Sequence, residues 1–128
     1  MPSRTPEDFE RAARAVWEGL PLQFRAALGN VTVAVADFAD AETLRTMRIR
    51  DAYELLGLYH GVGLPFKSET AATSFPDRIF LYRIPILDYA RGTGEPVDNV
   101  IRHVLIHEIG HHFGFSDDDM ERIEASES

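Results

Sequence analysis

The sequence predicts an α+β fold, in which helices at both ends of the chain enclose a middle region with three short strands. Apolar residues recur at helical spacing from Phe9 to Trp17 and predict a first helix. The alternating, β-branched run Val31–Val35 predicts a strand. A second helical pattern, from Pro96 to about His112, predicts the longest helix near the end of the chain.

In the first half of the chain, the helix boundaries have local signals. Thr5 followed by Pro6 and two acidic residues is typical of a helix start. A short helix at 24–28 is expected to end at Gly29 and Asn30, and a capped helix is expected from Asp40 to Met47.

The second half is expected to contain the other two strands, at 55–59 and 78–84, with a long loop at 60–76 between them. Long loops in compact domains are often functional. Pro85 is expected to end the third strand, with a helical turn at 85–90 and a turn at 92–96 before the long helix. Gly114 should end that helix, and a short helix is expected at 116–124. No repeat or linker interrupts the chain, so we expect a single domain at 1–128.

Composition narrows the function classes. The chain of 128 residues has no cysteine, which excludes disulfides and thiolate zinc sites, so that a metal must be held by His, Asp or Glu. The net charge of −8 argues against nucleic acid as a partner, because that binding relies on Lys and Arg. No apolar run has the length of a signal peptide or a membrane span, so we expect no membrane association and a soluble, cytoplasmic protein.

The long predicted helix carries a carboxylate on its apolar side. His107 and His111 lie one turn apart and project from the same side, so both imidazoles can reach one metal ion. Glu108 falls within the arc of apolar residues, where an unpaired buried charge is costly. The pattern His-Glu-x-x-His on a helix resolves this conflict, since its histidines bind zinc and its glutamate takes a proton from the attacking water. Glu108 is therefore the candidate base.

The pattern extends beyond the second histidine. Gly114 stands three residues after His111, and Asp117 stands six after it. A shuffled chain of this composition would contain His-Glu-x-x-His in roughly 2 of 100 cases, and the extended pattern in about one of ten thousand. Chance is therefore a poor explanation for the extended pattern.

Asp117 is the candidate third metal ligand. A catalytic zinc site usually has three protein ligands, and the chain after His111 is too short for a second packed helix to supply one. In the related pattern that ends in histidine, a glycine ends the helix and the chain turns back to the metal. Here aspartate stands in place of that histidine, and no separate downstream Met-turn follows. Asp118 and Asp119 are better explained by the start of a new helix.

Together, LLGLYHG (55–61), FPDRIFLY (75–82) and HEIGHHFGFSDDDM (107–120) resemble a family of small bacterial zincin-like metallopeptidases. The resemblance covers most of the chain and implies a compact zincin-like α+β domain with a small mixed sheet and a C-terminal active-site helix. It also implies one Zn²⁺ at His107, His111 and Asp117, with Glu108 as base, and a peptide or protein as substrate. Zincins generally receive peptide at an edge strand, for which Arg78–Ile84 is the expected candidate.

The pattern assigns no definite role to the three other histidines. His60 lies in the loop, His103 lies one turn before His107, and His112 falls on the apolar arc, as expected of a core residue or one that supports the ligands. The pattern does not choose among three candidates for stabilising an oxyanion, which are Tyr59, Tyr82 and Arg83.

Two other functions are compatible with this spacing of ligands. A metal-dependent endoribonuclease shares it, although such enzymes use a third His and lack a Glu directly after the first one. A non-catalytic, metal-containing module that binds peptide is the other. The glutamate and the charge of −8 favour the peptidase over the ribonuclease.

Overall fold

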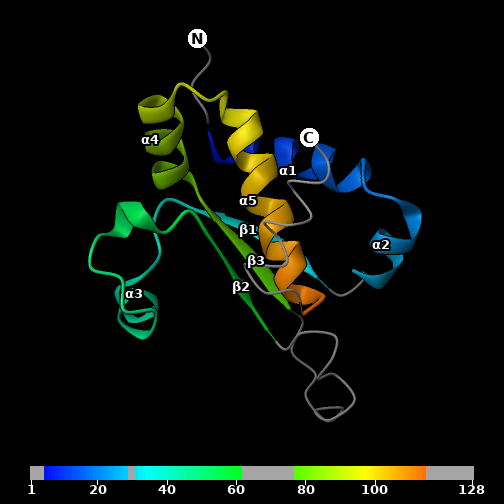
Figure 1. The fold of residues 1–128 in the computed structure, drawn as a ribbon, viewed down its shortest axis with the longest axis horizontal. Helices are drawn as coiled ribbons and strands as arrows, with labels where there is room; N and C mark the ends of the chain where they lie inside the picture. Colours follow the sequence, from blue (N-terminus) through cyan, green and yellow to red (C-terminus); the bar gives the residue numbers. More distant parts are fainter. Residues whose placement is uncertain (1–4, 29–30, 62–76, 115–128) are drawn as a thin grey trace.

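The computed structural model describes residues 5–28, 31–61 and 77–114 (Figure 1). The elements follow in the order α1 (Pro6–Glu18), α2 (Leu22–Ala27), β1 (Thr32–Ala36), α3 (Ala41–Thr46), a 3₁₀ turn (Ala52–Glu54), β2 (Gly57–His60), β3 (Arg78–Tyr82), α4 (Arg83–Thr93) and α5 (Val97–His112). Three predictions fall on residues outside the described ones: positions 62–76 of the loop expected at 60–76, the helix expected at 116–124, and Asp117.

The strands form a small mixed sheet in the order β1-β3-β2. β3 pairs parallel with β1 and antiparallel with β2. Helices and one small sheet together confirm the predicted α+β class, including the N-terminal helices and the C-terminal helix that carries the histidines.

The prediction for Arg78–Ile84 was wrong in two respects. Its first part is β3, which is the central strand and offers no free edge among the described strands. The strand also ends at Tyr82, and α4 begins directly at Arg83. Pro85 lies in the first turn of α4, where its missing N–H removes no helical hydrogen bond. A proline that was expected to end a strand therefore lies at the start of a helix.

The predicted helix starts are confirmed by their caps. Thr5 Oγ1 accepts from the Asp8 N–H at 3.1 Å, and Asp8 Oδ2 accepts from the Thr5 N–H at 3.0 Å. Asp40 caps α3 by accepting from the Thr43 N–H at 2.7 Å, and hydrogen bonds from Thr43 hold the pKa of Asp40 below its usual value. These short-range contacts satisfy helix N–H groups that have no partner within the helix.

The main core lies between one face of the sheet and helices α1, α4 and α5 (Figure 1). Ile79 and Leu81, which point to this face of β3, are fully buried. A second, smaller cluster lies around Tyr82, Leu55 and Ala39, with Phe80 and Leu58 packed against it. The larger core therefore determines where α5 lies on the sheet.

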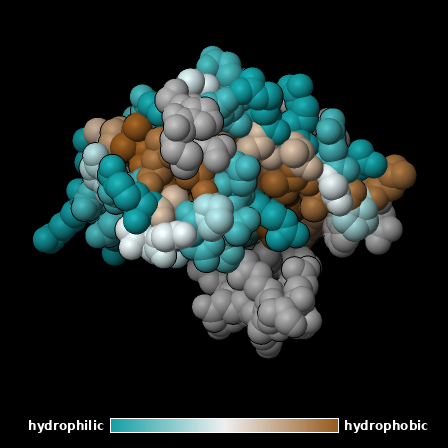
Figure 2. Space-filling model, turned by 90° about the horizontal axis from the view of Figure 1, so that it is seen from above, coloured by the Kyte–Doolittle hydropathy of each residue, from teal (hydrophilic) through white to brown (hydrophobic). Residues whose placement is uncertain are grey.

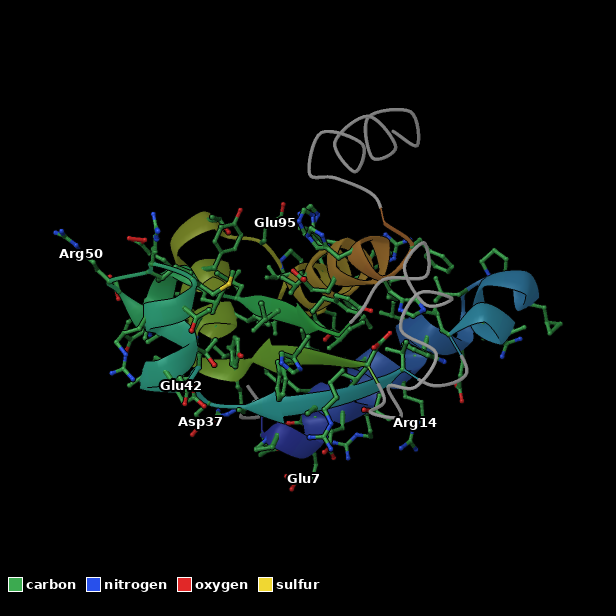
Figure 3. The ribbon with its side chains drawn as sticks, turned by 90° about the horizontal axis from the view of Figure 1, so that it is seen from below. Glu7, Arg14, Asp37, Glu42, Arg50 and Glu95 are labelled. Carbon is green, nitrogen blue, oxygen red and sulfur yellow. The ribbon has the colours of Figure 1, made fainter. Side chains whose placement is uncertain are left out.

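Asp37 follows β1 at the same end of the sheet as Glu42 of α3 (Figure 3).

The outer surface mixes hydrophilic residues with separate apolar patches (Figure 2). Large exposed apolar side chains include Leu22 on α2 and Tyr89 on α4. Single exposed apolar residues are normal on soluble domains. No described helix is both long and apolar enough to cross a membrane.

Thr5→Ala should lower the free energy of unfolding by about 1 kcal/mol, because α1 loses the side-chain acceptor of its first turn. Urea denaturation measures the change. Thr46→Ala, at an exposed position in the last turn of α3, is the control and should leave stability almost unchanged. Equal midpoints for Thr5→Ala and the wild type would show that this cap does not stabilise the domain.

Candidate metal centre

Helix α5 carries the core and the candidate site on different sides. Its apolar side is buried against the sheet and α1, through Val100, Ile101, Val104, Leu105 and Ile109. His107 and His111 are only partly buried. The rings of these two histidines approach with centroids 5.0 Å apart at an angle of 74°. The expected pair of imidazoles on one side of the helix is therefore present.

Glu108 lies close to both histidines. One donor atom each from His107, Glu108 and His111 lie within 4.8 Å of one another, and Glu108 is largely buried. Two imidazole nitrogens with an adjacent carboxylate are a donor set that suits Zn²⁺. The residues present therefore fit the metal that the sequence pattern implies.

The largely buried Glu108 faces strand β2 at Gly57. A Cβ added to Gly57 would lie 2.5 Å from Val104 Cγ1, 3.1 Å from the Phe80 carbonyl oxygen and 3.6 Å from Glu108 Cγ. No ordinary side chain fits at the first of these distances. Glycine at position 57 therefore lets α5 approach the strand closely and keeps Glu108 beside it.

Strand β2 is the edge of the sheet next to this site. α5 packs directly against β2. Among the described strands, only β3 pairs with β2, so the other side of β2 is an edge of the sheet. Tyr82 donates its N–H to the Leu56 carbonyl at 2.9 Å. Because bonded and non-bonded pairs alternate along an antiparallel ladder, Leu58 also bonds to β3, whereas Gly57 and Tyr59 direct their N–H and C=O groups outward. The edge that the sequence analysis assigned to Arg78–Ile84 is thus formed by β2.

The end of α5 matches the predicted helix stop. Gly114 has φ of 85°, a left-handed conformation that glycine adopts at little cost. Its N–H donates to the His111 carbonyl at 3.0 Å. The helix therefore ends just after His111, as a chain that turns back toward the metal requires. Asp117 itself lies outside the described residues and stays a predicted ligand.

The other histidines differ in their surroundings. His60 is exposed, and alternation along β2 directs its side chain to the sheet face opposite α5. His103 is exposed, and its ring lies 6.4 Å from that of His107, measured between centroids. His112 is 2% exposed, as its place on the apolar arc predicts. None of these three belongs to the group of donors around Glu108.

Each of the three oxyanion candidates is either bonded to other residues or buried. The Tyr59 hydroxyl is bonded in the interior, as described below. The Arg83 Nε donates to Asp37 Oδ1 at 2.8 Å. Tyr82 is 4% exposed, and burial raises its pKa, with smaller contributions from the Asp40 and Glu108 carboxylates. We therefore assign none of the three to the oxyanion.

Sequence reasoning missed two residues that shape this region, Gly57 and Asp77. Gly57 had a detectable signal, because a glycine inside a strand often marks the close approach of another part of the backbone or of a ligand. Asp77 had none, since an aspartate before a strand is most simply a solvated turn residue. Asp77 is nevertheless 2% exposed.

Gly57→Ala should push α5 away from β2, because its Cβ would overlap Val104, and should lower both stability and metal affinity. Thermal unfolding and a zinc titration measure the two effects. Gly92→Ala is the matched control, because a Cβ at Gly92 of α4 meets nothing within 4 Å. If Gly57→Ala binds zinc and unfolds like the wild type, the close contact does not determine the site.

Comparison with known proteins supports this reading of the geometry. No curated protein matches the chain. The family model described as zincin-like metallopeptidase matches residues 28–126, which include β1, all of β2 and β3, and the complete α5. That match covers well over half of the 128 residues and includes the helix with His107, Glu108 and His111. The chain therefore belongs to the zincin-like metallopeptidase family.

Proposed function

We propose that this protein is a zinc-dependent peptidase that hydrolyses peptide bonds with an activated water. The observation that carries the proposal is the group of His107, Glu108 and His111 on a helix that packs against β2, with Glu108 next to Gly57 of that strand. Membership of the zincin-like metallopeptidase family supports it. A peptide or protein substrate and a cytoplasmic location remain predictions from the sequence.

In this proposal His107, His111 and Asp117 would hold one Zn²⁺ per chain. When bound, the metal supplies a Lewis acid that polarises the scissile carbonyl and makes water a stronger acid. Each histidine would offer one ring nitrogen to the metal. The rigid α5 holds both rings in place, because its opposite side is buried in the core.

Glu108 acts as the base in the proposed reaction. Its carboxylate takes one proton from the attacking water, whose oxygen forms a bond with the carbonyl carbon. The carbon–nitrogen bond then breaks, and the proton passes from Glu108 to the leaving amine. Water is thus divided between the two products, and Glu108 returns to its ionised form.

The outer edge of β2 is the proposed binding place for the substrate. Gly57 and Tyr59 present main-chain donors and acceptors along it, as an added peptide strand requires. Gly57 also lies next to Glu108. A peptide paired with this edge would pass beside the base, which is how zincins generally use their edge strand.

The two alternatives predict different outcomes. A metal-dependent ribonuclease would cleave RNA and not peptides, and a binding module would bind peptide without cleaving it. Incubation of the zinc-loaded protein with a peptide library and, separately, with RNA distinguishes the three. Cleavage of peptides alone supports the proposal, whereas cleavage of RNA alone or uncleaved, bound peptide contradicts it.

His107→Ala and His111→Ala should each abolish zinc binding at micromolar zinc, because each removes one of the few protein ligands. Elemental analysis of the dialysed proteins measures the zinc content. His103→Ala is the matched control, since it removes an exposed histidine one turn earlier on the same helix. Undiminished zinc content in both ligand variants would overturn the proposed site.

Glu108→Gln should retain zinc and lose peptide hydrolysis by a factor of roughly 10² or more, because the attacking water loses its base. Zinc content and the rate of peptide cleavage are measured on the same preparation. Cleavage at the wild-type rate would assign the activity to another group or to a contaminant. Loss of zinc would show instead that Glu108 is a ligand.

Asp117→Ala should lower zinc affinity strongly, whereas Asp118→Ala and Asp119→Ala should change it little. The reason is the spacing after Gly114, which places only Asp117 at the position of the third ligand in the related pattern. Asp117→His should preserve binding. Zinc titrations of the four variants decide the assignment, and a failure of Asp118→Ala or Asp119→Ala alone would move the ligand to that residue.

A further inference from the structure

Three polar side chains from separate segments meet in the interior near the end of α5. Tyr59 comes from β2, Asp77 directly precedes β3, and His112 is the last residue of α5. The Tyr59 hydroxyl lies 2.7 Å from Asp77 Oδ2 and 2.9 Å from His112 Nδ1, and His112 Nδ1 lies 3.1 Å from Asp77 Oδ2. Asp77 and His112 are each 2% exposed. We call these three residues the buried triad.

The donors and acceptors of the buried triad match. Burial and the Asp77 carboxylate raise the pKa of Tyr59, so its hydroxyl keeps its proton and donates to Asp77. His112 Nδ1 lies within hydrogen-bond distance of the Tyr59 hydroxyl and of Asp77 Oδ2, so the tautomer with a proton on this nitrogen can donate to the carboxylate. One carboxylate thus accepts from two donors.

Filling this part of the interior with the buried triad costs more free energy than filling it with apolar side chains. A buried carboxylate loses its hydration, and hydrogen bonds compensate this loss only in part. Apolar side chains of similar volume often stabilise a core at least as well as a buried ion pair. A demand for a fixed geometry is therefore a better explanation for the buried triad than stability alone.

The backbone leaves room for the group at Gly61. A Cβ added to Gly61 would lie 2.2 Å from Asp77 Oδ1 and 2.5 Å from Asp77 Cγ. The segment that follows β2 therefore lies directly against the Asp77 carboxylate. Only glycine allows this approach without displacing Asp77.

The buried triad gives β2 and α5 a second contact point. Gly57 meets Val104 and Glu108, and two residues further along the strand Tyr59 meets His112. Two residues of a strand span about 7 Å, and the four residues from Glu108 to His112 span about 6 Å of helix. The two contacts therefore match in spacing and hold the last turn of α5 in register with the strand. His111, between Glu108 and His112, lies in that turn.

We propose that the buried triad of Tyr59, Asp77 and His112 is a positioning device for the metal site, which keeps His111 and Glu108 aligned with the edge of β2. This inference rests on the proposed zinc site and adds three residues that act through others. Hydrogen bonds made directly to metal ligands tune metal sites, and their loss typically lowers metal affinity by roughly 10-fold to 100-fold. The buried triad acts one step further away, through the backbone of α5, so we expect an effect at the lower end of this range.

Tyr59→Phe is the sharpest test, because it removes the hydroxyl and leaves the ring in place. Zinc affinity, measured by competition with a chelator, should fall by roughly 10-fold. The visible spectrum of the Co²⁺-loaded protein, which reports ligand geometry, should also change. Tyr89→Phe is the matched control, since it removes the same group from a side chain that is 48% exposed, and both readouts should stay unchanged.

Two further variants keep the test informative if one of the substitutions impairs folding. His112→Asn retains a hydrogen-bond donor near the place of Nδ1 and should keep more zinc affinity than His112→Ala. Gly61→Ala should displace Asp77 while leaving the three side chains of the buried triad chemically unchanged, and it should reproduce the spectral change, whereas Gly92→Ala should not. Thermal unfolding of the metal-free proteins reports their fold separately.

The outcomes separate this inference from the proposed function. Tight zinc binding by the wild type, with equal affinity and an unchanged Co²⁺ spectrum in Tyr59→Phe and Gly61→Ala, would overturn the positioning role alone. Lower stability of the metal-free variants with unchanged affinity and spectrum would also overturn it, because the buried triad would then be only structural. A wild-type protein that binds no zinc would instead refute the proposed function, and the positioning role with it.

Discussion

The close contact between α5 and strand β2 is the constraint on which the candidate site depends. The core places α5 across the sheet, but apolar packing tolerates small rotations and shifts of a helix. The contact at Gly57 tolerates less displacement of the helix, because Val104 occupies the space that a side chain at position 57 would need. The close approach of Glu108 to strand β2 therefore depends on glycine at position 57, which has no side chain.

Helix α5 combines stability and chemistry within four turns. Its apolar side supplies much of the core, and His107 and His111 lie on its less buried side. A site on a rigid helix holds its side chains more accurately than a site on a loop. In the proposed positioning role, the buried triad supports the last turn of α5, where His112 contacts Tyr59. The candidate site thus lies between two contacts to the same strand.

In the proposed function, the edge of β2 is the feature that suits a peptide substrate. An exposed strand edge pairs with main-chain N–H and C=O groups, which every peptide carries. Recognition of this kind reads the backbone and leaves side-chain preference to neighbouring pockets. Nucleic acid would instead require clustered Lys and Arg, which a chain with a net charge of −8 does not favour. We therefore propose a peptide rather than RNA as the substrate.

The sequence by itself determined the features that depend on neighbouring residues. The caps at Thr5 and Asp40, the span of α5, its end at Gly114 and the placement of two histidines on one side all follow from local spacing and local hydrogen bonds. Such features involve only a few consecutive turns, and the pattern of residues therefore predicts them directly. The α+β class followed from the same periodicities.

Only the tertiary structure decided which strand is the edge and what supports the site. Alternation along 78–84 is the same for a central strand and an edge strand, so pairing between distant segments had to assign β3 to the centre. The buried triad joins residues that are 18 and 53 positions apart in the chain. No periodicity relates such positions, because their approach depends on how the sheet and helices pack together.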